Sequence, residues 1–204
     1  AWIYKATEAH SGPIFIEGIT GTGLKGLAQP DRPLIEFIGN SITCGAAADP
    51  SETACGAGVY HDQHNAYNAY GPRVARALGT NYILSSISGI GIYRNWNTDG
   101  PTMPQVYEKA DFQFEGNRLW NFATYKPNVV SIALGTNDFS NGDGRRERHP
   151  FDSALFVGKY IKFAGVVKAK YPEARIALLS SPMSTGERRV KLQNCLSAVK
   201  IAID

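Results

Sequence analysis

Three polar segments of this sequence contain the residue types that acyl transfer requires. Ser41 could supply a hydroxyl nucleophile. Its own N–H, the N–H of Gly89 and the side-chain amide of Asn137 could donate hydrogen bonds to a developing oxyanion. A glycine at position 89 lets the backbone approach that oxyanion without an intervening Cβ, and the amide of Asn137 stays a neutral donor at every working pH. These residues indicate attack of a serine on an acyl carbonyl.

The three residues can meet if parallel strands deliver them to one edge of a sheet, because sites in open α/β sheets form beyond the carboxyl ends of the strands. An apolar, strand-like run precedes each of them, and a fourth follows later. The runs are 34–38, 81–87, 129–134 and 175–179. Helical patterns alternate with them over 67–78, 153–171 and 187–203. This alternation predicts an α/β fold, a three-layer α/β/α sandwich with a mainly parallel sheet.

Each expected helix has apolar residues at the spacing of one buried face. For the three helices in chain order, these residues are Tyr67, Tyr70, Val74 and Leu78; Phe156, Tyr160, Phe163 and Val167; and Leu192, Leu196, Val199 and Ile203.

Residues 1–33 differ from the rest and predict a short β-rich segment ahead of the α/β domain of residues 34–204. Pro13–Ile16 is strand-like. Gly21–Gly26 formally matches GxGxxG, but Pro30 and Pro33 follow at once and exclude the helix that a dinucleotide site requires.

The composition excludes several classes of protein. A net charge of +3 is too small and too scattered to indicate a nucleic-acid partner. No apolar run approaches the roughly 20 residues of a membrane-spanning helix, so no membrane partner is expected. The chain begins AWIYKATEAH, without the basic and apolar regions of a signal peptide, which is therefore expected to be absent or removed. Cys44 and Cys55 could form a disulfide if their Cα atoms lie within about 7 Å, and free thiols are equally open.

Four segments, in this order, resemble those of the SGNH (GDSL) hydrolases. They are more closely similar to carbohydrate esterase family 2, whose members remove acetyl groups from plant polysaccharides. The segments are IEFIGNSITCG (35–45), YGPRVARALG (70–79), SGIGIYRNWN (88–97) and LGTNDFS (134–140). Residues 5–19 also resemble the end of that family's N-terminal β-sandwich. Residues 1–33 are therefore expected to be the C-terminal remnant of such a domain plus a linker.

The resemblance implies a role for each matched residue. Ser41 matches the nucleophile, and Gly89 and Asn137 match the further oxyanion donors. Asp138 matches a position that we interpret as a hydrogen-bonding brace for its loop and not as a base. The sequence departs from the pattern at Asn40, where Asp is usual, which removes one negative charge beside the nucleophile.

The general base is not identified in this sequence. In the resembled family the catalytic histidine lies in a later block, and His149 is the histidine that follows Asn137 here. It lies in a basic segment with Arg145, Arg146 and Arg148, which we interpret as a solvated loop. The base is expected beyond residue 204. A fragment, a base supplied by another chain and an inactive protein are the explanations left open.

Two other sets of residues have competing interpretations. His61 and His64 have a spacing that suits a metal pair, but a third ligand is not evident, so we expect a structural role and no metal. Either could alternatively replace the missing base, since both precede the first expected helix near the same sheet edge. Tyr93 and Trp96 follow the Gly89 turn and are candidates to line a sugar cleft, whereas Trp120 is expected in the core.

The function that follows is a serine esterase that removes O-acetyl groups from plant cell-wall polysaccharides through an acetyl-enzyme, without a cofactor. Acetylated polysaccharide is the expected partner, and secretion or periplasmic residence follows from that substrate. A carbohydrate-binding module of esterase descent and a thioesterase or lysophospholipase of the same fold are the alternatives. The polar residues after Gly91 favour a polar ligand over an acyl chain.

Overall fold

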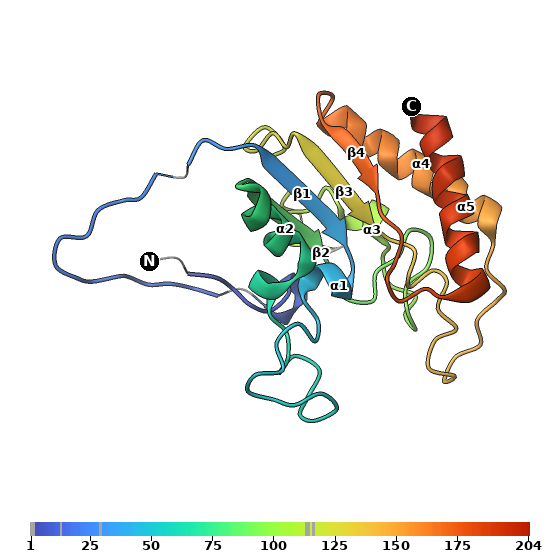
Figure 1. The fold of residues 1–204 in the computed structure, drawn as a ribbon, viewed down its shortest axis with the longest axis horizontal. Coiled ribbons are helices and arrows are strands. Elements are labelled where there is room, and N and C mark those ends of the chain that lie inside the picture. Colours follow the sequence, from blue (N-terminus) through green and yellow to red (C-terminus); the bar gives the residue numbers. More distant parts are fainter. Residues whose placement is uncertain (1–2, 13, 29, 113–114, 116) are drawn as a thin grey trace.

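A four-stranded parallel sheet forms the centre of the molecule (Figure 1). The computed structural model describes residues 3–12, 14–28, 30–112, 115 and 117–204. The strands are β1 (Leu34–Gly39), β2 (Asn81–Ser86), β3 (Val129–Ala133) and β4 (Arg175–Leu178), in the spatial order β2-β1-β3-β4. Each lies within the run that the sequence predicted or extends one residue beyond it, so the α/β fold with a parallel sheet is confirmed.

Helices cover both faces of this sheet (Figure 1). They are α1 (Ser41–Cys44), α2 (Tyr70–Leu78), α3 (Met103–Val106), α4 (Ser153–Lys170) and α5 (Gly186–Ile203), with 3-10 turns η1 (Ala9–Ser11) and η2 (Ala66–Asn68). Successive side chains of a strand point to opposite faces. Accordingly, Ile38 of β1 packs in the cluster that contains the buried faces of α4 and α5, whereas Phe37 packs with Ala75 of α2. The result is the predicted three-layer sandwich.

The long helices α4 and α5 bury the faces that their periodicity predicted. Phe156, Tyr160, Phe163 and Val167 of α4 are at most 1% exposed. In α5 the buried residues are Leu192, Cys195, Leu196 and Val199. Among the described residues, no helix is long and apolar enough to cross a membrane.

Helix α2 buries a different face from the one predicted. Val74 and Leu78 are 42% and 64% exposed, and the buried residues are Gly71, Pro72 and Ala75. A Cβ at Gly71 would approach the Phe37 ring to 2.8 Å, which is closer than carbon atoms pack. The helix thus lies so close to β1 that small residues fill the contact, and Val74 and Leu78 remain outside.

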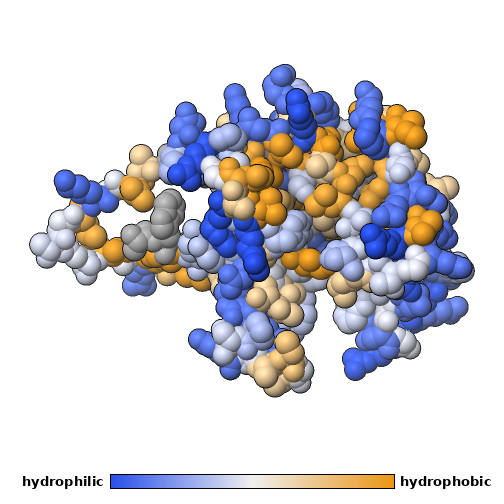
Figure 2. All heavy atoms as spheres, in the orientation of Figure 1, coloured by the Kyte–Doolittle hydropathy of each residue, from blue (hydrophilic) through white to orange (hydrophobic). Residues whose placement is uncertain are grey.

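The N-terminal segment contradicts the prediction of a β-rich region. In the described part of residues 3–33 there is one 3-10 turn, η1, and no strand; Pro13 lies outside the described residues. Ile14, Phe15 and Ile16 are 56–83% exposed on an arm that projects from the body (Figures 1 and 2). An extended segment becomes a strand only when a neighbour pairs with its N–H and C=O groups, and this arm runs apart from the sheet.

Candidate active site

The register of the sheet aligns the strand ends that precede the predicted site residues. Gly39, the last residue of β1, pairs with Ser86 of β2 and with Ala133 of β3. The chain therefore leaves three adjacent strands at the same edge before it reaches Ser41, Gly89 and Asn137. This alignment gives the physical basis for bringing together residues nearly one hundred positions apart in the sequence.

Ser41 begins α1 directly after β1, at a tight turn. Oδ1 of Asn40 caps the helix by accepting the N–H of Ile42 at 3.2 Å. A Cβ at Gly39 would collide with the side chain of Thr43, so the turn requires glycine there. Asn at position 40 therefore keeps the local capping role without the charge of an Asp.

Gly89 adopts the left-handed conformation, with φ of 76°, which favours glycine. Its carbonyl accepts the N–H of Trp96 at 2.8 Å, and the N–H of Gly91 donates to Oδ1 of Asn95 at 3.0 Å. The chain from Gly89 to Trp96 is thus closed on itself by hydrogen bonds. A loop held this way presents a fixed backbone donor, as an oxyanion hole requires.

Asp138 braces this loop from the end of β3, as the sequence analysis expected. The carboxylate is fully buried and accepts the backbone N–H groups of Ile92 at 3.0 Å, Tyr93 at 2.8 Å and Arg94 at 3.3 Å. Burial raises the pKa of Asp138, and the three N–H donors oppose that shift. Its oxygen atoms are occupied by the loop, so Asp138 is a brace and not a proton acceptor for substrate.

The three predicted catalytic residues line one cavity of about 540 Å³. Trp96 lies on its wall together with Tyr60, Ser88 and Arg188. A larger hollow of about 910 Å³ lies between α4, β4 and α5, and Leu178, Leu196 and Ile203 line it without any predicted site residue. The smaller cavity is therefore the candidate active site, because the acyl-transfer groups converge there.

Tyr60 lies beside Ser41, the predicted nucleophile, and no pattern in the sequence indicates this contact. Its hydroxyl donates to Oγ of Ser88 at 2.8 Å and also interacts with the hydroxyl of Ser41. Partial burial raises the pKa of Tyr60, so the phenol stays protonated near neutral pH and acts as a donor. The sequence gives no indication of a role for Tyr60, because this residue lies on a long loop between α1 and η2 with no motif around it.

The two aromatic residues predicted to line a sugar cleft, Tyr93 and Trp96, lie in different environments. Trp96 is 43% exposed and lines the cavity. Tyr93 instead packs against Phe151 and Phe156, and its hydroxyl accepts the N–H of Asp152 at 3.2 Å. The ring of Tyr93 thus lies beside the core while its backbone N–H donates to Asp138, and its role in a sugar cleft stays a prediction.

The basic segment that contains Arg145 and Arg148 is only partly the solvated loop that the sequence predicted. Arg145 is exposed as expected, but Arg148 is partly buried and donates to the carbonyl oxygens of Asn95 at 2.7 Å and Asn137 at 2.9 Å. One guanidinium thus connects the two loops that carry the oxyanion donors. His149 is exposed, and its carbonyl accepts a hydrogen bond from Arg94.

The cysteines and histidines of the long loop lie as follows. Cys44 is buried, Cys55 is exposed, and both are free thiols, so the structure contains no disulfide between them. His64 is buried, with Nε2 3.2 Å from Oε1 of Glu8, and His61 lies next to it. No pattern in the sequence indicates Glu8, because it lies far from the histidines in the chain and only the tertiary fold brings it to this place.

Comparison with known proteins connects this geometry to a family. The model of the GDSL-like lipase/acylhydrolase family matches residues 37–199. An acetylxylan esterase / glucomannan deacetylase of Cellvibrio japonicus is 32% identical over 185 residues, which cover 89% of this chain and 51% of the relative.

Two solved structures share the fold. The carbohydrate esterase family 2 enzyme with a carbohydrate-binding domain from Corynascus thermopiles (Myceliophthora fergusii) superposes with a TM-score of 0.84 at 28% identity, over 98% of this chain and 62% of that one. The family 2 carbohydrate esterase of Clostridium thermocellum, solved with cellohexaose, has a TM-score of 0.69 at 31% identity, over 86% and 51%. The chain thus spans about half the length of the Cellvibrio relative it matches.

Proposed function

The chain belongs to the GDSL-like lipase/acylhydrolase family, and from that premise we propose that it is a serine esterase that removes O-acetyl groups from polysaccharides. The observation that carries this proposal is the convergence of Ser41, Gly89 and Asn137 on one cavity. The relative named as an acetylxylan esterase / glucomannan deacetylase supports the substrate class. The related structure solved with cellohexaose supports a glycan ligand.

The proposed reaction begins with attack of Oγ of Ser41 on the acetyl carbonyl. The N–H groups of Ser41 and Gly89 and the amide of Asn137 donate to the oxyanion, which develops as the carbonyl becomes tetrahedral. Collapse of this intermediate releases the sugar hydroxyl and leaves an acetyl-enzyme, which water then hydrolyses to acetate. The reaction needs no cofactor.

The proton of Ser41 needs an acceptor during the attack, because a neutral serine hydroxyl is a weak nucleophile. Tyr60 interacts with that hydroxyl but is held in its protonated form. Imidazole added to the solution can accept the proton in place of a side chain. A rate that rises with imidazole and depends on Ser41 therefore measures the nucleophile and the oxyanion hole independently of the base.

The experiment compares the chain with Ser41→Ala and with Ser197→Ala, which alters an exposed serine of α5. Hydrolysis of p-nitrophenyl acetate and of acetylated xylan oligosaccharides is measured with and without imidazole. We expect the Ser41→Ala rate to fall to that of buffer, and the Ser197→Ala rate to match the parent. An acetyl group on Ser41, detected by mass spectrometry after rapid quenching, would identify the intermediate.

The same assays separate the alternatives. Saturable binding of polysaccharide without any Ser41-dependent turnover would instead identify a carbohydrate-binding module. Preference for long acyl thioesters over acetylated sugar would identify a thioesterase. Trp96 at the cavity wall favours a sugar, since aromatic faces pack on the apolar faces of pyranose rings.

We further propose that the protein acts outside the cytoplasm, in the medium or the periplasm. A plant cell-wall polysaccharide is too large to enter a cell, so an enzyme that deacetylates it must meet it outside. Fractionation of the source cells, with the protein followed by antibody, tests this location.

A further inference from the structure

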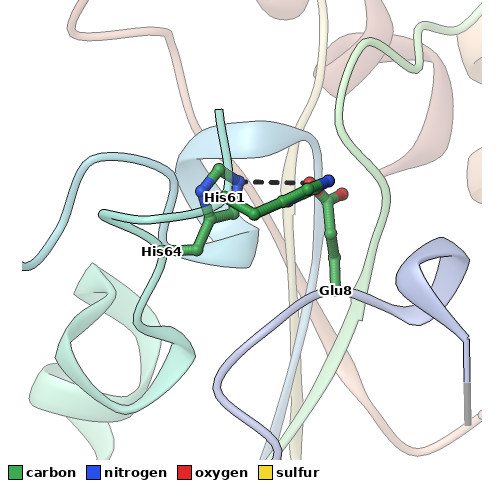
Figure 3. Close-up of side chains that lie close together, drawn as sticks. All are labelled: Glu8, His61 and His64. Carbon is green, nitrogen blue, oxygen red and sulfur yellow. Dashed lines mark ion pairs between the residues drawn. The ribbon is translucent and has the colours of Figure 1, made fainter. Parts of the chain in front are cut away.

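Glu8, His61 and His64 form a compact cluster beside the candidate active site (Figure 3). One ligand atom from each residue lies within 4.8 Å of the others. Figure 3 shows the carboxylate of Glu8 reaching from the N-terminal segment toward the two imidazoles, which come from the loop that precedes α2. Glu8 is therefore a third candidate ligand, which could be recognised only once the fold brought it beside the two histidines.

The spacing within the cluster suits a shared cation. Two ligands that are about 2.1 Å from one tetrahedral zinc ion lie roughly 3.4 Å apart. Nε2 of His64 lies 3.2 Å from Oε1 of Glu8, without the alignment of a hydrogen bond between them. Close approach without hydrogen-bond alignment is expected of two atoms that ligate the same ion.

Burial of these polar side chains is energetically unfavourable when no ligand is bound. The side chains of Glu8 and His64 are both 0% exposed. Among the described residues, none forms a hydrogen bond to either ring nitrogen of His64, although both atoms are buried. A buried polar atom without a partner costs free energy. Metal ligation at one ring nitrogen would remove part of that cost.

A second set of contacts fixes the carboxylate, as is typical around metal ligands. Glu8 accepts the N–H and the hydroxyl of Ser88, each at 2.6 Å, and Sγ of Cys44 lies 3.3 Å from its Oε2. The backbone before Glu8 is held as well, because the N–H of Ala66 donates to the carbonyl of Ala6 at 3.0 Å. The carboxylate thus approaches the histidines from a fixed position.

We propose that Glu8, His61 and His64 bind a zinc ion. Two imidazoles and one carboxylate form a ligand set that zinc uses in proteins, and imidazole ligands select it over the hard cations Mg²⁺ and Ca²⁺. The ion would join the N-terminal segment, the loop that carries both histidines and, through Glu8, Ser88. Because Ser88 precedes the oxyanion donor Gly89, metal binding would stabilise the loop that forms the oxyanion hole.

The test uses the full chain after treatment with a chelator. Zinc chloride is titrated into it by isothermal calorimetry, and the melting temperature is measured in parallel. We expect one ion per chain, a dissociation constant of about 1 µM or tighter, and a melting temperature that rises with the zinc concentration. Magnesium chloride at the same concentrations should produce neither effect.

Variants assign the site. His61→Ala and His64→Ala should each weaken zinc binding by about 100-fold or more, and Glu8→Gln should do the same. His149→Ala and Glu17→Gln, at exposed positions, are the matched controls and should bind as the parent does. Circular dichroism shows whether each variant is folded. His61 is half-buried, so its removal remains informative if His64→Ala does not fold.

The proposal fails if the folded parent takes up no zinc, or if His149→Ala weakens binding as much as His61→Ala. It also fails if magnesium raises the melting temperature as zinc does. None of these measurements uses esterase activity, so they can fail while the proposed hydrolase function stands, and the converse also holds.

Discussion

Nδ2 of Asn137 lies 2.8 Å from the carbonyl oxygen of Ile90 and donates a hydrogen bond to it. One hydrogen of the amide therefore holds the loop that contains Gly89, and the second is left for the oxyanion. The same side chain thus holds the loop of Gly89 and is itself the third predicted donor.

Replacement of Asn137 by Ala should lower kcat for p-nitrophenyl acetate by about 10²–10³-fold, because one oxyanion donor is lost. KM should change much less, since the donor acts mainly in the transition state. Asn141→Ala, at an exposed position nearby, is the control and should retain the parent rate. Equal kcat values for Asn137→Ala and the parent would remove Asn137 from the oxyanion hole.

Asp138→Asn should destabilise the protein. The amide can accept from some of the N–H groups of Ile92, Tyr93 and Arg94, but its NH₂ group cannot accept from them, so a buried donor is left unpaired. We expect a loss of about 1–3 kcal/mol in the free energy of unfolding. Urea denaturation measures it, and Asp99→Asn, whose side chain is 98% exposed, should change little. A fully stable Asp138→Asn variant would show that Asp138 does not brace the loop.

Arg148 is a positioning residue for the oxyanion loops, since its two terminal nitrogens donate to Asn95 and Asn137. Arg148→Ala should reduce kcat more than it raises KM. Arg148→Lys should not restore the rate, because an ammonium group lacks the planar fork that reaches both carbonyls. Arg145→Ala, at an 88% exposed side chain, should behave as the parent does. If Arg148→Lys restores the full rate, charge alone suffices and the fork is not needed.

Trp96→Ala should weaken the use of sugar substrates. We expect KM for acetylated xylan oligosaccharides to rise several-fold, because an aromatic surface on the cavity wall is lost. The rate with p-nitrophenyl acetate should be nearly unchanged, since this ester is too small to need that surface. A loss of activity equal for both substrates would place Trp96 in the structure of the oxyanion loop and not in substrate binding.

Glu36 predicts a pH dependence of stability. Its carboxyl group is 2% exposed, and burial raises its pKa although Ser85 and Tyr107 donate to it. The folded protein therefore holds this proton at pH values where the unfolded chain, with a pKa of about 4.3, has lost it. The stability that the proton provides is fully present below the unfolded pKa and is lost as the pH rises through the folded one.

Glu36→Gln removes that titration. Relative to the parent, the variant should gain stability as the pH rises from about 4 toward 8, as measured by urea denaturation at several pH values. Glu173→Gln, at an exposed position, should follow the parent curve throughout. Parallel curves for Glu36→Gln and the parent would contradict the raised pKa.

Much of the fold could be read from local patterns. The buried strands β1 and β3 are mostly apolar runs, and α4 repeats its apolar residues at helical spacing, so each element carries its own signal. Helix α2 shows the limit of such patterns. Its buried face was decided by Phe37, which lies far away in the sequence and packs against the small residues Gly71 and Ala75.

The site was predictable to the same extent. Ser41, Gly89 and Asn137 follow strands directly, so the position of each depends on a short connection and on the parallel register. The interpretation of Arg148 as part of a solvated loop was wrong, because its environment depends on contacts with Asn95 and Asn137, which no local pattern shows.

The sequence by itself determined the succession of strands and helices along the chain, because adjacent residues and short turns produce them. It also predicted a nucleophile and its oxyanion donors at the ends of those strands. Only the tertiary structure decided that Glu8 lies against His64 and that Tyr60 lies beside Ser41. Those contacts arise where long loops and the N-terminal segment fold back onto the sheet edge. The path of such loops is determined by packing and hydrogen bonds between distant residues, and not by the repeating pattern of any single segment.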